Sequence, residues 1–154
     1  MAKIERKYMA HYIEVGEGQY VRLGEDLEEY APEMSASVEK SKNILGQTSV
    51  AITGYEKSAT VEPYFARKGD PLFERLQAII DGSLVLDALK THVVEVKLWE
   101  ENEGGFPAVR EEAYLEVTSY GGNTEGYQIP FVIHYTGAKT QGRFDVDSKA
   151  FLEE

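Results

Sequence analysis

Hydrophobic and polar residues alternate along most of this chain with a period of two, the pattern of β-strands that bury one face. Glycine, asparagine and proline residues separate the alternating segments and predict turns. The pattern predicts about eight strands and one helix, and so a mainly β (α+β) fold: a β-sandwich or barrel with one flanking α-helix. The expected strand segments are residues 3–15, 20–23, 34–42, 48–54, 59–65, 93–99 and 112–120, followed by a final hairpin of residues 127–136 and 142–146.

One segment departs from the alternation and predicts an amphipathic helix over residues 71–82. Asp70 is a residue type that caps helices, and Pro71 suits the first helical position. Gly82 suits the C-terminal stop. Apolar residues at helical spacing form one stripe, so the helix should lie on a sheet, with the stripe in the core rather than at a cofactor site. The stripe consists of Leu72, Phe73, Leu76, Ile79 and Ile80.

The segment before the helix alternates like a strand but is too polar for a buried core. Residues 34–42 and 48–54 predict a hairpin whose tip carries two aliphatic side chains, Ile44 and Leu45. Hairpin tips are normally polar, so this tip either packs against its own core or contacts another molecule. Polar strands of this kind favour a protein that assembles with copies of itself. The predicted contact loop is Lys42, Asn43, Ile44, Leu45, Gly46 and Gln47, within an extended hairpin near residues 40–48.

Length and composition narrow the classes of function. The chain has 154 residues, which predicts a single domain over residues 1–154. A net charge of −11 opposes binding to nucleic-acid phosphates. The absence of cysteine excludes disulfides, thiolate metal sites and a cysteine nucleophile. No long apolar run follows the opening MAKIERK or occurs elsewhere, so we expect neither a signal peptide nor a membrane span.

Side chains that carry catalysis or bind metals are not arranged in a recognised motif. The three histidines, His11, His92 and His134, are far apart and lack the spacing of a zinc site. Carboxylates are abundant in any acidic chain and do not by themselves indicate acid–base catalysis. We therefore expect no enzyme activity, no cofactor and no metal site.

Ten tyrosines leave a second class of function open. An exposed row of them would suit a monomeric β-sandwich binding module, for example for carbohydrate. At strand spacing, tyrosines more often pack within sheets. An enzyme is a third and more distant class. Rings or tubes in electron micrographs would separate an assembling protein from a monomeric module.

Six segments in a fixed order resemble a known family. They are MAKIERKYMAHYI, DLEEYAPEMSASVEKSKNILG, GYEKSATVEPYFA, DPLFERLQAIID, REEAYLEVTSYGG and YQIPFVIHYTG. Together they are similar to major tail tube proteins of tailed phages and prophages of Gram-positive bacteria. The resemblance covers nearly the whole chain and rests on this collinear order, because no single motif is diagnostic. The sequence departs from the family pattern in the acidic turn at residues 100–107.

The resemblance implies a structural role in a virion. Six copies would form a ring by joining their inner sheets, and stacked rings would form the hollow tail tube through which DNA leaves the capsid. The implied partners are the chain itself, the tape-measure, tail terminator and baseplate proteins, and DNA that passes without specific binding, but no membrane. Assembly would take place in the cytoplasm of the host bacterium. Tube subunits of contractile tails and of type VI secretion particles have related folds, so they remain alternatives.

The alternation within the hairpin predicts which of its faces meets the channel of such a tube. Glu39 lies on the polar face of the first strand, with Ser49, Ala51 and Thr53 as a candidate partner row. We expect Glu39 to line the lumen. The opposite row, Val50 with Ile52, is apolar enough for the core under the helix.

Two later segments also combine a small polar residue with a glutamate on the same face of a strand. Glu62 follows Thr60, and Glu116 precedes Thr118. We expect Glu62 and Glu116 to be lumen-facing as well, because a wall of carboxylates repels DNA phosphates. The opposite row of the later segment, Leu115 with Val117, is expected in the core.

Overall fold

The computed structural model describes residues 1–100 and 104–154, which form eleven β-strands, one α-helix and two short 3₁₀ helices. The strands are β1 Met9–Gly16, β2 Gln19–Leu23, β3 Ala36–Lys42, β4 Thr48–Tyr55, β5 Ser58–Val61, β6 Lys90–Lys97, β7 Phe106–Val117, β8 Gly121–Asn123, β9 Gly126–Gln128, β10 Phe131–Asp145 and β11 Ala150–Glu153. The helices are η1 Arg6–Tyr8, α1 Pro71–Gly82 and η2 Leu86–Leu89. The predicted fold class, mainly β with one flanking α-helix, is confirmed for these residues.

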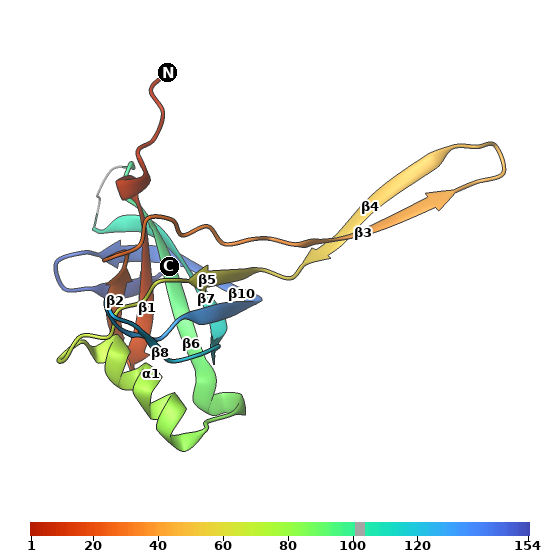
Figure 1. Ribbon diagram of the computed structural model, residues 1–154. Helices are drawn as coiled ribbons and strands as arrows, with labels where there is room; N and C mark the ends of the chain where they lie inside the picture. Colours follow the sequence, from red (N-terminus) through yellow and green to blue (C-terminus); the bar gives the residue numbers. More distant parts are fainter. Residues whose placement is uncertain (101–103) are drawn as a thin grey trace.

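Most strands belong to one curled antiparallel sheet (Figure 1). Its order is β11–β10–β7–β6–β1–β2, and β5 also pairs with β10. The long strand β10 is therefore flanked by β7 on one side and by β5 and β11 on the other. The outer strands of this sheet are β2 at one end and β5 with β11 at the other. The short ribbon β8–β9 and the ribbon β3–β4 form separate sheets.

The expected hairpin of residues 127–136 and 142–146 is wrong. Residues 131–145 form one strand, and Lys139 and Thr140 pair with β7 where the turn was expected. The register shifts between Tyr135 and Lys139, and Gly137 has a φ of 91° there. A β-bulge accommodates such a glycine and bends the strand without ending it.

Helix α1 covers one face of the sheet (Figure 1). The carboxylate of Asp70 accepts a hydrogen bond from the backbone N–H of Leu72 at 3.0 Å, as an N-cap does. The predicted apolar stripe is confirmed: Leu72, Leu76 and Ile79 are buried, and the other two members are half-buried. The C-terminal cap of the helix differs from the prediction, because Ser83 and not Gly82 takes the left-handed conformation, with a φ of 47°.

Both faces of the sheet are packed. Beneath α1, the sheet contributes buried side chains such as Ile13, Val93 and Phe131. On the opposite face, the curl encloses a second core of Ala10, Tyr12, Tyr20, Val94, Val96, Ala108 and Phe144. Adjacent residues Val93 and Val94 are therefore both fully buried, one in each core. Across the described residues, no helix is both long enough and apolar enough to cross a membrane.

The first residues of two strands differ most from the expectation. β1 begins at Met9, after the short helix η1, and β7 begins at Phe106, six residues before the segment predicted from alternation. The extra residues of β7 pair with β6 and with the second half of β10. The expected hairpin would have turned that half of β10 away from β7. Residues 101–103 of the expected acidic turn lie outside the described residues.

Candidate assembly surface

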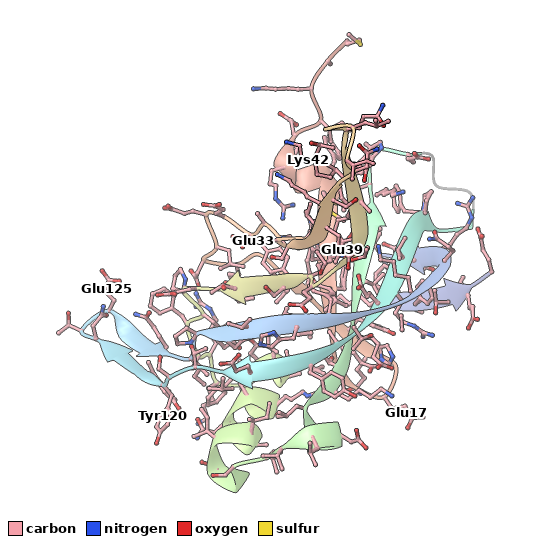
Figure 2. The ribbon with its side chains drawn as sticks, turned by 90° about the vertical axis from the view of Figure 1, so that its right-hand side faces the viewer. Glu17, Glu33, Glu39, Lys42, Tyr120 and Glu125 are labelled. Atoms are coloured by element: carbon pink, nitrogen blue, oxygen red, sulfur yellow. The ribbon has the colours of Figure 1, made fainter. Side chains whose placement is uncertain are left out.

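The ribbon β3–β4, residues 36–55, projects away from the body of the protein, and we call it the arm (Figure 1). Every residue of β3 is exposed, and in β4 only Gly54 is partly covered. At about 3.3 Å per residue, the seven residues of β3 span about 23 Å. Figure 2 looks along the arm, with Glu39 and Lys42 on it. An isolated two-stranded hairpin is marginally stable in water, so this one suits a partner surface.

One face of the arm is polar. Residues directly opposite in an antiparallel pair share a face, and Glu39 lies opposite Ala51. Ser41 lies opposite Ser49, and their hydroxyl oxygens are 2.6 Å apart. The structure thus brings Glu39 next to two members of the candidate partner row. Thr53 falls at a register irregularity, where its hydroxyl donates to the carbonyl of Ser37.

The other face of the arm is apolar and flanked by lysine. Val38 lies opposite Ile52, and Lys40 lies opposite Val50. The prediction that Val50 and Ile52 lie in the core under the helix is wrong: their exposed fractions are 59% and 57%. They are exposed because β4 belongs to the projecting arm and does not pack on the body.

The tip of the arm is held in one conformation by Asn43. Its side-chain oxygen accepts hydrogen bonds from the backbone N–H groups of Leu45 and Gln47, both at 3.0 Å. Its amide nitrogen donates to the side-chain oxygen of Gln47 at 2.8 Å. Gly46 supplies a φ of 80° in the same turn. The turn presents Ile44, fully exposed, and Leu45, 77% exposed, rather than packing them on the protein's own core.

The root of the arm is fixed by a lysine that follows β4. The ammonium of Lys57 lies 2.9 Å from Glu111 and 3.2 Å from Glu95, and 4.4 Å from the centre of the Tyr135 ring. Glu111 is buried, and its second oxygen accepts from the backbone N–H of Gly137 at 3.1 Å. Burial alone would lower the pKa of Lys57, but the bond to Glu111 and the charge of Glu95 raise it, so the residue stays cationic.

Further contacts tie the segment between β2 and the arm to the same cluster. The hydroxyl groups of Tyr30 and Tyr135 are 2.9 Å apart, and burial raises the pKa of both well above the ordinary value. His11 lies 3.6 Å from Glu95. Contact with His11, followed by the charge of Lys57, lowers the pKa of Glu95 to about 2 against the opposing effect of burial.

Backbone pairing completes the root. Glu33 and Ser58 form an isolated β-bridge, with N–H to carbonyl distances of 2.7 and 3.0 Å. The backbone N–H of Glu56 donates to the carbonyl of Ser35 at 3.1 Å. Both strands of the arm are therefore held by backbone hydrogen bonds where the arm joins the body. The sequence pattern did not reveal this root, because its charged members are far apart along the chain and each resembles a solvated strand position.

The other two carboxylates predicted to face the lumen lie on the body. Glu116 of β7 is exposed and lies opposite Val132 of β10, which in turn lies opposite Thr60 of β5. Glu62 directly follows β5 and continues its exposed row. Glu62 and Glu116 thus belong to the β5–β10–β7 part of the sheet, whereas Glu39 lies on the arm, where Figure 2 labels it. Leu115 is buried and Val117 packs against the core beneath α1, as predicted.

The histidines lie in three separate places. His11 is buried beside Tyr30, His92 lies 3.0 Å from Glu14, and His134 lies 2.6 Å from Glu116. Among the residues that the structure describes, no group of three or more histidine or acidic side chains is arranged to hold a metal ion.

Neither the protein-family models nor the curated proteins that we compared with this chain give a match.

Proposed function

We propose that this protein is a structural subunit that assembles with copies of itself into a hollow tube, as the tail tube protein of a phage or prophage. The arm is the observation that carries this proposal. It projects from a rigid root and buries almost nothing against its own body. Exposed aliphatic side chains on a segment of this kind are typical of a contact surface.

The tip of the arm supports stacking of rings. Ile44 and Leu45 would bury their side chains on the next ring, which stabilises a contact by about 1.5–3 kcal/mol for each. In a ring of six copies this contact would repeat six times. Because the turn is already ordered by Asn43, little conformational freedom would be lost on docking.

The outer strands of the sheet support closure of a ring. Unpaired strand edges promote association unless they are blocked. Here β2 is the outer strand at one end of the sheet, and β5 with β11 lies at the other. Pairing between the different ends of neighbouring copies is a head-to-tail contact, which closes into a ring when its rotation does.

The acidic balance supports a channel for DNA. Glu39, Glu62 and Glu116 would line it, and a net charge of −11 per subunit would keep phosphates from binding. The tape-measure, tail terminator and baseplate proteins would be the other partners. The tube would be assembled in the cytoplasm of the host bacterium and reside in the virion tail. The same features also suit the tube subunit of a contractile tail or a secretion particle.

A carbohydrate-binding module gains no support from the tyrosines. Half of the ten are buried in the two cores: Tyr12, Tyr20, Tyr30, Tyr64 and Tyr135. The most exposed ones, Tyr8, Tyr55 and Tyr120, belong to the short helix η1, the arm and the segment after β7. They do not form a row on one strand, as a sugar platform would require.

Electron microscopy of the purified protein over a range of concentrations tests the proposal. We expect rings or tubes above a critical concentration, with a hollow centre. Light scattering in the same samples should show a mass that rises with concentration. A protein that stays monomeric, or forms only closed two-fold dimers under all conditions, would contradict it.

A further inference from the structure

An open apolar groove lies between the end of α1, η2 and the end of β7. Its volume is about 440 Å³, and its apolar walls come from Ile79, Ile80, Leu84, Leu89, Leu115 and Val117. Tyr120 lines it beyond the end of β7 and is 63% exposed. Helix α1, which supplies one wall of the groove, lies at the lower end of the body in Figure 1, whereas the arm leaves the side of the body and points away from α1.

Aliphatic side chains beside the groove are also exposed to water. Val85 and Leu86 have exposed fractions of 66% and 78%. The backbone at Leu86 has a φ of 55°, in the left-handed region that is costly for a bulky residue. A strained segment that presents two aliphatic side chains next to an apolar groove is a feature of contact surfaces.

The arm and this groove have complementary charges. Residues 79–89 and 115–120, which supply its walls, include Asp81, Asp87 and Glu116 but no lysine or arginine. The arm, residues 36–55, carries two lysines and one glutamate, which is a net charge of +1. Since the whole chain has −11, the remainder has −11 − 1 = −12. A basic arm is therefore attracted to an acidic body.

A second apolar groove, near the N-terminus, is the competing receiver. It is lined by Ile4, Tyr8 and Trp99, among others. The segment that supplies most of its wall, residues 2–8, has three basic residues and one acidic residue. Its positive charge repels the lysines that flank the tip of the arm, so charge favours the groove at α1.

We propose that the groove between α1, η2 and β7 receives the arm tip of a second copy of this chain, with Ile44 and Leu45 in the groove and Lys42 toward Asp81 and Asp87. This inference rests on the proposed assembly function and names the surface that completes it. The tip and the groove are different surfaces of one molecule. A contact between them is head-to-tail and propagates, which yields rings or filaments rather than closed dimers.

Because the chain has no cysteine, engineered thiols can map this contact without background. One preparation carries Leu45→Cys in the arm, and a second carries Tyr120→Cys in the groove. The matched control carries Trp99→Cys, which places the thiol at an aromatic residue of the competing groove. Pairs of preparations are mixed, allowed to assemble, checked by microscopy and oxidised mildly. Ile44→Cys serves as a second donor in case the first variant assembles poorly.

We expect a disulfide-linked dimer from the mixture with Tyr120→Cys and at least tenfold less of it from the mixture with Trp99→Cys. A disulfide forms only between cysteines whose Cα atoms lie within about 7 Å of each other. Assembled particles that cross-link through Trp99→Cys, or through neither site, would overturn this inference and leave the assembly function standing. If the unmodified protein never assembles and no mixture cross-links, the assembly function fails and the inference fails with it.

Discussion

The ammonium of Lys57 lies 2.9 Å from the carboxylate of Glu111, whose side chain is only 5% exposed. Lys57 stands two residues after the end of β4, and Glu111 lies in the middle of β7. This ion pair therefore joins the root of the arm to the centre of the sheet. It is also held by Glu95 and by the ring of Tyr135, so the direction of the arm depends on a buried cluster rather than on a flexible linker.

Replacing Lys57 should lower both the thermal stability of the subunit and the extent of its assembly. Lys57→Ala leaves the buried carboxylate of Glu111 without its cation, which costs about 3–5 kcal/mol. For a domain of this size we expect the melting temperature to fall on the order of 10 °C. Thermal melting followed by circular dichroism measures the effect.

The matched control for that experiment is Lys68→Ala, at an exposed lysine outside the strands. Its melting temperature should stay close to that of the unmodified protein. Equal melting temperatures for Lys57→Ala and the unmodified protein would mean that the ion pair does not stabilise the root.

Acid should weaken the root through Glu95. Contact with His11 and the charge of Lys57 lower the folded-state pKa of Glu95 to about 2, whereas the unfolded value is 4.5. The ionised carboxylate thus stabilises the fold above the unfolded pKa, and this contribution is lost as the pH falls toward 2. We expect the contribution to be on the order of 3 kcal/mol.

Denaturant unfolding curves of the unmodified protein and of Glu95→Gln at several pH values isolate this contribution. Between pH 4.5 and 2, the free energy of unfolding should fall less steeply in Glu95→Gln. Glu17→Gln, at an exposed turn, should retain the steeper fall. Parallel curves for all three proteins would contradict the assignment to Glu95.

The tip of the arm should be required for assembly but not for folding. The double substitution Ile44→Ser with Leu45→Ser removes two aliphatic side chains that are exposed in the subunit. The melting temperature of the subunit should therefore stay the same. Long tubes should disappear, because each lost burial weakens the stacking contact by about 1.5–3 kcal/mol.

Counting tubes in micrographs measures that effect. Glu125→Ser, at the turn between β8 and β9, is a control on another exposed hairpin (Figure 2). If the double variant at residues 44 and 45 still forms long tubes, the tip is not the stacking contact.

Reversing charge in the proposed lumen should make DNA bind to the tube. Glu39→Lys with Glu62→Lys adds two lysines per subunit, which amounts to twelve in a ring of six. Each phosphate neutralised by such a lysine adds an attraction that weakens with salt. We expect slower DNA ejection from particles with these tubes, and recovery of the rate at high salt.

The control for the lumen is Glu17→Lys with Glu125→Lys, which makes the same change of net charge at two exposed turns. Ejection should stay fast with these tubes. Ejection that is unchanged in well-formed tubes of the lumen variant would mean that Glu39 and Glu62 face elsewhere.

Local patterns predicted the elements whose structure depends on neighbouring residues. The helix followed from Asp70, Pro71 and a single apolar stripe, and the arm followed from alternation on both sides of a turn. The strand β10 was missed because Gly137 and its polar neighbours resemble a turn. The strand resumes where Lys139 pairs with Glu111 of β7, a long-range contact that no local pattern contains.

The candidate site was predictable only in part for the same reason. Ile44 and Leu45 stand out because aliphatic residues at a turn are unusual. Val50 and Ile52 were assigned to the core, because alternation shows which residues share a face but not whether that face meets the body. The groove at α1 depends on Leu84 and Val117 meeting in space, which no spacing in the sequence indicates.

The rigid root has a geometric consequence for the regularity of an assembly. For an arm about 23 Å long, a rotation of about 5° at the root moves the tip by about 2 Å. That displacement is comparable to the radius of a methyl group and is enough to move Ile44 out of a fitted contact. In a polymer the same error would recur in every subunit and accumulate as a change in rise or twist from layer to layer. The cluster of Lys57, Glu95 and Glu111 would thus set the helical parameters of such a polymer.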